Sequence, residues 1–384
     1  MRARFAVLAL ALLALLPMSG VAAGPAWEQW KSVQGVFDLG GPRADGSLIV
    51  AGSAALYTLT PAGDLTPFAR GPGGYREDPS AEAYFALSPG QKVASAGCTF
   101  GRDDIFILRL HTPIGITRVD KSGEATGSFT NLALPSLNGV AFDTVGSFDH
   151  RLIATGSANG KMQVVAVDCA GATQVITSVA PTFEGGIAVA PTSFGSFGGY
   201  LIAPDELSGV IWAISPQGNA SKVVDSGLPK GGDIGVESVG FVPPGFGKGG
   251  YLYYSDRKTP GNPHPGTDSV LRMSSADLMG GGVQEGDMLA VTEGGATMID
   301  VRCDPTCHVS VVVGAPSTAH GEGHLVFTLS NQASPSPSAR PTLASTATAS
   351  GSGSGGLPLA VVILVAGVAA AAGAGIAVAL LRRR

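Results

Sequence analysis

The feature of this sequence that most constrains its fold is a phrase that returns about every fifty residues. The phrase contains a small apolar segment, a Gly-rich gap, two short strands of alternating character, and a turn that ends in Gly. Clear copies begin at Asn138 (NGVAFD), Glu184 (EGGIAVAP) and Glu237 (ESVGFVPP). A unit of this size cannot bury its own faces, so neighbouring copies must stack. The repeat therefore predicts an architecture of stacked β-meanders.

Six copies fit into the body of the chain, and the centres of their first strands lie 47 to 57 residues apart. Short runs of alternating apolar and polar residues predict half-buried strands. Six near-equal repeats favour a ring of blades over one or two β-sandwiches. We therefore predict an all-β, six-bladed β-propeller of four-stranded antiparallel blades, followed by a C-terminal transmembrane helix. The predicted first-strand centres are Val36, Phe85, Val140, Ile187, Val239 and Ala296.

The last copy is short and predicts how the ring closes. It has room for three strands, at residues 296–302, 308–313 and 324–329. Residues 27–33 precede the first copy and have no other role in the repeat. We expect them to supply the missing strand of the last blade, because closure removes exposed sheet edges.

The two ends of the chain predict export and anchoring. Residues 1–23 carry Arg2 and Arg4, a short apolar run and a small-residue cleavage pattern, as signal peptides do. Residues 357–381 are apolar and uncharged over a length that spans a bilayer, and three arginines follow at 382–384. The tail also resembles bacterial C-terminal sorting signals of the Gly-Gly type, which are cut after export, so its retention stays open.

These features predict a single-pass cell-membrane protein with the propeller on the extracytoplasmic side. Residues 333–356 are almost entirely Ser, Pro, Ala, Thr and Gly, a composition that favours a flexible stalk. The predicted parts are a signal peptide at 1–23, a propeller ectodomain at 24–332, the stalk at 333–356, a transmembrane helix at 357–381 and a cytoplasmic basic tail at 382–384.

Charge and cysteine content narrow the function further. The net charge of −5 gives no reason to expect nucleic acid as a partner. Four cysteines in an exported body suggest disulfides. Cys303 and Cys307 flank a turn sequence and favour a local bridge, which leaves Cys98 to pair with Cys169 if their copies are neighbours. A metal site at Cys303 and Cys307 is the weaker alternative, because no second ligand pair has zinc-site spacing.

The phrases NGVAFD and GGIAVAP, followed by YLIA and VIWAISPQG, resemble six-bladed propellers of the NHL and SMP-30/gluconolactonase-like group. The resemblance covers about three hundred residues of the body. Lactonase-like members hold a divalent metal at one channel mouth through acidic residues and an Asn. Asn138 matches the group's Asn-Gly phrase, whereas Glu184 and Glu237 match by position only. The first copy lacks the group's early acid unless Asp38 serves.

The residue before each inner strand is expected at one mouth of the central channel. This position is occupied by Glu82, Asn138, Glu184, Glu237 and Glu293 in successive copies. Converging oxygen ligands suit a hard cation, so we predict Ca²⁺ or another divalent cation there. The predicted metal ligands are Asn138, Glu184, Glu237 and Glu293, with Glu82 assigned to ligand binding. The alternative is that these carboxylates only solvate a loop face.

Two loops and one cluster add candidate residues. Residues 256–268 form a long polar insertion with Arg257 and Lys258, and residues 75–78 begin with Tyr75 and Arg76. Such loops often carry recognition, so we assign these four residues to ligand binding. The HGEGH segment at 320–324 places two His and one Glu on one face of an extended chain, where they could bind a transition metal with His308 as a further ligand. The alternative, favoured by the Gly residues of the segment, is a mobile hairpin.

Two functions follow from these expectations. The first is a membrane-anchored, extracytoplasmic binding module for an extracellular protein, a glycan or a small molecule. The alternative is a metal-dependent, lactonase-like hydrolase, in which the metal activates water. The first is preferred because no catalytic triad, phosphate loop or dinucleotide fingerprint is present in the sequence.

Overall fold

The fold is described from a computed structural model over residues 24–53, 55–70, 82–313 and 317–330. The predicted signal peptide, stalk, membrane span and basic tail, together with Tyr75 and Arg76, lie outside the described residues. Within the described residues, no helix combines the length and the hydrophobicity that crossing a membrane requires.

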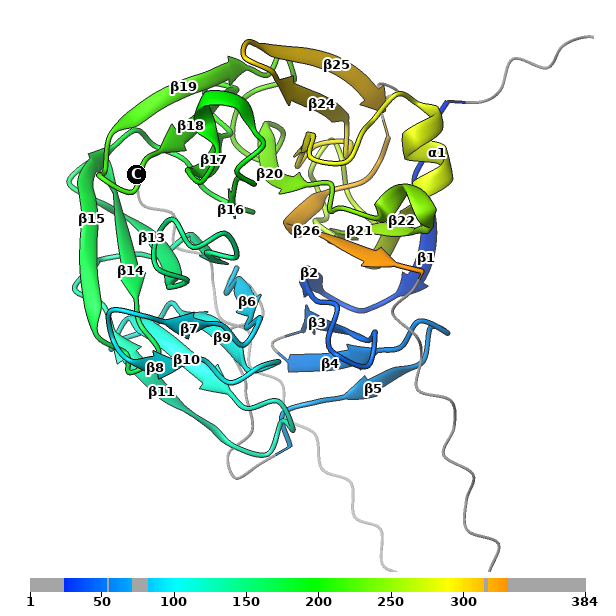
Figure 1. Cartoon of the computed structure of the whole chain (residues 1–384). Helices are drawn as coiled ribbons and strands as arrows, with labels where there is room; N and C mark the ends of the chain where they lie inside the picture. Colours follow the sequence, from blue (N-terminus) through cyan, green and yellow to red (C-terminus); the bar gives the residue numbers. More distant parts are fainter. Residues whose placement is uncertain (1–23, 54, 71–81, 314–316, 331–384) are drawn as a thin grey trace, which may run out of the picture. The chain divides into compact units, whose positions relative to one another are not determined.

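Six four-stranded antiparallel sheets surround a central axis, which confirms the six-bladed propeller (Figure 1). Each of the first four sheets comes from one continuous segment, and its first strand lies innermost. The first sheet contains β2 (Val36–Gly40), β3 (Leu48–Gly52), β4 (Ala55–Leu59) and β5 (Leu65–Pro67). The second contains β6 (Phe85–Leu87), β9 (Ile105–Arg109), β10 (Gly115–Val119) and β11 (Thr126–Asn131).

The next two sheets follow the same plan. The third contains β12 (Gly139–Phe142), β13 (Leu152–Ala158), β14 (Lys161–Val167) and β15 (Thr173–Ala180). The fourth contains β16 (Ala188–Val189), β17 (Leu201–Asp205), β18 (Val210–Ile214) and β19 (Ala220–Asp225). Short elements decorate the ring: β7 (Lys92–Val93), β8 (Cys98–Thr99), η1 (Gly195–Phe197), η2 (Phe246–Lys248) and α1 (Ser275–Gly280).

The last two sheets exchange strands, which the repeat did not predict. The chain enters the fifth sheet with β20 (Val236–Phe241), crosses to the sixth for β21 (Gly250–Asp256) and β22 (Ser269–Ser274), and then returns. The fifth sheet is completed by β23 (Met288–Thr292), β24 (Met298–Cys303) and β25 (Cys307–Val313). The sixth sheet receives β26 (Gly321–Leu329) as its innermost strand and β1 (Glu28–Ser32) as its outermost.

The prediction that Ala296 centres a sixth inner strand is therefore wrong. Ala296 lies between β23 and β24 with φ of 49°, and β26 occupies the innermost position instead. The predicted strands of the last copy exist, but they are divided between two sheets. The physical reason is that β20 pairs with β23, after the chain has already built two strands of the next blade.

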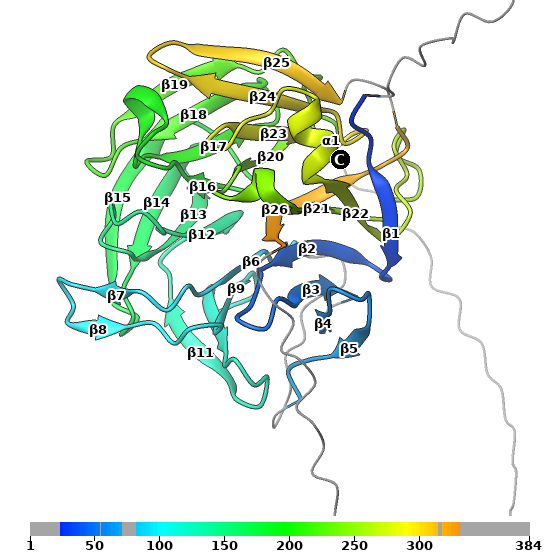
Figure 2. The same cartoon turned by 45° about the vertical axis from the view of Figure 1, so that its right-hand side comes forward.

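The prediction that residues 27–33 close the ring is confirmed. β1 pairs antiparallel with β22 at the outer edge of the sixth sheet (Figure 2). The Trp27 indole nitrogen donates a hydrogen bond of 2.9 Å to the Ala296 carbonyl, and Trp30 packs against Tyr253. Glu28 accepts two hydrogen bonds from Arg272, at 2.7 and 2.9 Å. The N-terminal strand is thus held to the end of the ring by both apolar and polar contacts.

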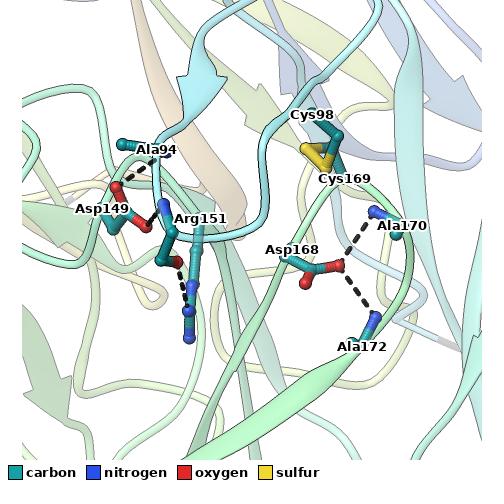
Figure 3. Close-up of a disulfide and its surroundings, with 9 residues drawn as sticks. Ala94, Cys98, Asp149, Arg151, Asp168, Cys169, Ala170 and Ala172 are labelled. Atoms are coloured by element: carbon teal, nitrogen blue, oxygen red, sulfur yellow. Dashed lines mark hydrogen bonds between the residues drawn. A yellow bond between two sulfur atoms is a disulfide. The ribbon is translucent and has the colours of Figure 1, made fainter.

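Both suggested disulfides are present. Cys303 and Cys307 face each other at the turn between β24 and β25. Cys98 bonds to Cys169 and joins the β7–β8 hairpin of the second blade to the third (Figure 3). Asp149 adds to this junction, because its carboxylate accepts hydrogen bonds from the backbone of Ala94 and Ser95. The hairpin is therefore fixed at two points.

Asp300 on β24 gives a stability prediction away from the channel. Its side chain is 7 % exposed, its Oδ1 has no hydrogen-bond partner, and burial followed by the neighbouring Asp287 raises its pKa to about 7. A carboxyl group whose pKa is raised by folding stabilises the fold at low pH. This stabilisation is lost as pH rises through the pKa of the folded state. The free energy of unfolding of Asp300→Asn, relative to wild type, should therefore increase by at least about 1 kcal/mol when pH is raised from about 5 to about 8.

Urea unfolding at both pH values measures this difference. Asp225→Asn is the matched control, because Asp225 is exposed and pairs only with Lys222 at the surface. An equal difference at both pH values would contradict the assignment.

Candidate functional site

The innermost strands begin around one cavity of about 210 Å³ at the channel mouth. Seven of its lining residues are carboxylic acids, and they come from every blade except the first and third. Asn138, Tyr84 and two leucines complete the wall. The acidic lining residues are Glu82, Glu184, Glu206, Asp233, Glu237, Glu293 and Glu322.

A glycine explains why the Glu-Gly phrase of the repeat builds this cavity. Gly185 has φ of 76°, and a Cβ at this position would lie 2.2 Å from both the backbone oxygen and the Oε1 of Glu237. Only glycine adopts this conformation at little cost and allows such an approach. Gly185 therefore lets two neighbouring blades bring Glu184 and Glu237 to the same mouth.

Tyr84 joins two buried carboxyl groups. Its hydroxyl lies 3.0 Å from Glu237 Oε1 and 2.8 Å from Glu322 Oε2. A phenol has one hydrogen to donate, so both contacts are satisfied only when one carboxyl group is protonated. Burial first, and then the charge of Glu322, raise the pKa of Glu237 well above its usual range.

Arg257 reaches the mouth from the 256–268 insertion. Its Nη1 lies 2.7 Å from Glu82 Oε1 and 3.3 Å from Glu322 Oε1. The insertion thus contacts two of the carboxyl groups that line the cavity. The negative charge of Glu322, together with burial, still raises the pKa of Glu82 to about 7.

A second basic group lies deeper in the mouth. His320 Nε2 is 2.8 Å from Glu293 Oε1 and 3.5 Å from Glu322 Oε1. Burial opposes a charge on the ring, but the two carboxylates outweigh it and raise the pKa of His320 to about 10. Ligand atoms of these three residues all lie within 4.8 Å of one another, and they form the one such group among the described residues.

Glu206 links the remaining carboxyl groups. It follows β17, and its Oε1 accepts hydrogen bonds from Ile234 N at 3.2 Å and Gly235 N at 3.4 Å. Its carboxyl also interacts electrostatically with those of Glu184 and Glu293. Burial, followed by the neighbouring Glu293, raises the pKa of Glu206 to about 7. Burial, followed by the neighbouring Glu206, raises the pKa of Glu184 to about 7 as well. Such carboxyl pairs are stable only while they share protons or bind a cation.

The predicted metal ligands Asn138, Glu184, Glu237 and Glu293 all line this cavity. Asn138 is also tied to the protein, because its Nδ2 donates to the Phe183 carbonyl at 3.0 Å and its Oδ1 lies 3.4 Å from Thr155 Oγ1. Glu293 is the one of the four that belongs to the convergent group with His320 and Glu322.

The other predicted residues divide between the mouth and the surface. Glu82 and Arg257 meet at the mouth, while the exposed Lys258 contributes a backbone hydrogen bond to Asp268. His308 lies on the outer strand β25 beside Thr306, so it does not join His320.

His324 serves the channel rather than the mouth. Its Nδ1 lies 2.9 Å from Asp38 Oδ1, and its Nε2 lies 2.7 Å from the Val140 carbonyl. Asp38 is completely buried and also accepts a hydrogen bond of 2.8 Å from Phe85 N. His324 and Asp38 thus connect four blades across the axis. Asp38, whose role in the first copy was open, is a partner of this histidine.

Sequence reasoning missed Glu206 and the union of Glu293 with the HGEGH segment. Glu206 follows the second strand of its blade, a position that the alignment of first strands did not sample. The sequence did contain a signal for the contact between Glu293 and the HGEGH segment, because HGEGH is the densest His/Glu segment of the chain. Its connection to Glu293 arises from the strand exchange, which places β26 beside β20.

No protein-family model matches the chain, and no curated protein matches it. Solved propellers are similar in fold. A putative TolB from Agrobacterium tumefaciens is 14 % identical, with a TM-score of 0.42 over 75 % of this chain and 83 % of that one. A catalytically inactive virginiamycin B lyase from Staphylococcus aureus, solved with quinupristin, is 10 % identical, with a TM-score of 0.44 over 79 % and 82 %.

A streptogramin B lyase is 13 % identical, with a TM-score of 0.41 over 79 % of this chain and 95 % of that one. At such identities the likeness concerns the fold alone. The resemblance to the NHL and SMP-30/gluconolactonase-like group stays a prediction.

Proposed function

We propose that this protein is an extracytoplasmic binding module that binds a divalent cation at the mouth of its propeller channel. The observation that carries the proposal is the set of seven carboxylic acids around one cavity of about 210 Å³. Two basic side chains, Arg257 and His320, contact this set. The remaining negative charge is offset by protons in the cation-free protein, and a dication offsets it more effectively at neutral pH.

The same geometry disfavours anionic and apolar ligands. An anion entering the mouth would meet carboxylates on most sides. An apolar group would leave buried polar atoms without hydrogen-bond partners. A bound dication offsets part of this negative charge and gives the module a point of attachment for neutral oxygen ligands, such as the hydroxyl groups of a glycan. The predicted C-terminal span would hold the module at the membrane.

We prefer binding to lactonase-like hydrolysis for a specific reason. The resemblance assigns Asn138 to the metal, but both polar atoms of its side chain contact neighbouring protein groups. Asn138 therefore stabilises the segment around Phe183, and this structural role explains why the residue is there.

Equilibrium dialysis of the full chain against Mg²⁺, Ca²⁺, Mn²⁺ and Zn²⁺ chlorides tests the proposal at neutral pH. We expect one dication per chain, and at least about tenfold weaker binding in the double variant Glu293→Gln/Glu322→Gln, since a lost factor of ten is about 1.4 kcal/mol.

The control replaces two exposed acids of a surface turn, Asp120→Asn/Glu124→Gln, where the hydrogen bonds stay within the turn. This control should bind as wild type does. Absence of any retained dication, or equal binding by the two double variants, would reject the proposal.

A further inference from the structure

We propose that Glu293, His320 and Glu322 form a first-row transition-metal site within the channel mouth. This inference rests on the proposed cation-binding function and deepens it, because it names the ligands and the class of metal. One imidazole nitrogen and two carboxylate oxygens already lie within 4.8 Å of one another. All three residues are at least nine-tenths buried, with exposures of 7 %, 2 % and 2 %.

The backbone fixes these three side chains without help from an ion. Glu293 O accepts a hydrogen bond of 2.7 Å from Gly321 N, which joins the end of β23 to the start of β26. His320 N donates to Asp256 Oδ1 at 2.8 Å. At Gly321 a Cβ would lie 2.1 Å from the Tyr254 ring, so the glycine allows β26 to pass close to β21. A rigid frame of this kind reduces the cost of ordering ligands around a metal.

An independent observation indicates that the site is incomplete in protein contacts. The His320 ring is 3 % exposed, and its Nδ1 has no hydrogen-bond partner among the described residues. Buried polar atoms are almost always paired. The ring faces the two carboxylates through Nε2, the nitrogen that would ligate the metal, and water or another bound group is expected to complete the contacts of Nδ1.

Neighbouring side chains already orient one ligand as metal sites require. Glu322 Oε2 is 2.8 Å from the Tyr84 hydroxyl, and its Oε1 is 3.3 Å from Arg257 Nη1. Such outer contacts fix the direction of a ligating carboxylate. Glu293 and Glu322 of this group also line the cavity of about 210 Å³.

The donor set selects the class of metal. Imidazole together with carboxylate suits Mn²⁺, Co²⁺, Zn²⁺ or Fe²⁺, whereas Ca²⁺ takes six to eight oxygen ligands. The sequence predicted Ca²⁺ or another divalent cation from the oxygen ligands of Asn138, Glu184, Glu237 and Glu293. The presence of His320 among the convergent ligands shifts the expected preference to a transition metal.

Cobalt binding to the full chain tests this site. Addition of CoCl₂ to metal-free protein should produce a visible absorption band, and Zn²⁺ should displace the band while Ca²⁺ does not. His320→Ala should weaken Co²⁺ binding at least about tenfold. The matched control is His264→Ala, because His264 lies on the loop near the mouth and bonds only to the Ser317 carbonyl through its ring. This control should keep the band.

A measurement on unaltered protein guards against a folding defect in His320→Ala. Pulsed electron paramagnetic resonance of the Cu²⁺-loaded chain should show coupling to the nitrogens of one imidazole. Dication binding without imidazole coupling, and unchanged in His320→Ala, overturns the transition-metal site and leaves the proposed function standing. Failure to bind any dication overturns both.

Discussion

Replacing His324 with alanine should lower the free energy of unfolding by about 3 kcal/mol near neutral pH. The imidazole bridges Asp38 Oδ1 and the Val140 carbonyl across the channel, and its removal leaves a fully buried carboxylate without its charged partner. Three backbone N–H groups, those of Leu39, Phe85 and His324, still donate to Asp38. The expected loss is therefore at the lower end of the range for broken buried pairs.

Chemical denaturation of wild type and variant measures this loss, with His308→Ala as the control. His308 is exposed on the outer strand β25 and its ring contacts Thr306, so its replacement should cost less than about 0.5 kcal/mol. Burial opposes a positive charge on His324, but the carboxylate of Asp38 outweighs burial and raises the pKa of His324. The stabilisation should thus be complete below the unfolded pKa and decline as pH rises through the folded one. Equal losses for the two variants would contradict the bridging role.

The cation-free protein should become less stable as pH rises from about 5 to about 8. Burial and the neighbouring Glu293 raise the pKa of Glu206 to about 7, and a raised carboxyl pKa stabilises the fold only while the group keeps its proton. For the buried Glu206 the loss is on the order of 3 kcal/mol. Glu184 and Glu82 act in the same direction, with smaller effects because solvent screens them.

A saturating dication should remove this loss. At one thousand times its dissociation constant, a ligand specific for the folded state adds about 4 kcal/mol. Thermal unfolding of the full chain over this pH range, with and without MnCl₂, measures how stability changes with pH in the metal-bound and metal-free protein. Glu206→Gln should flatten the pH dependence of the metal-free protein, and Glu124→Gln on an exposed turn should not. A metal-free midpoint that stays constant over this pH range would refute the electrostatic description of the mouth.

Much of this architecture was predictable because the repeat is local. Alternation within each copy fixes the first four blades, and the residue before each inner strand leads to Glu82, Asn138, Glu184 and Glu237 at the mouth. The N-terminal strand was also predictable, since an unpaired segment and a short last copy complement each other. These inferences use only order along the chain and the need to bury strand edges.

The strand exchange was not predictable in the same way. β20 pairs with β23 rather than with β21, although both candidates follow it and both are largely buried strands. Pairing depends on contacts between blades, which a period of fifty residues does not record. The convergence of Glu293, His320 and Glu322 follows from this exchange, so this group of side chains became visible only in three dimensions. Asp38 and His324 are likewise partners that lie at opposite ends of the sequence.

Anomalous diffraction from crystals of the full chain soaked in MnCl₂ tests the central claim most directly. An anomalous difference peak at the channel mouth, within about 2.0–2.3 Å of ligand atoms of Glu293, His320 and Glu322, is the result we predict. Crystals of His264→Ala should show the same peak, and crystals of His320→Ala should show it weakened or displaced. A well-diffracting soaked crystal with no anomalous density in the cavity would contradict the proposal that this propeller binds a dication at its mouth.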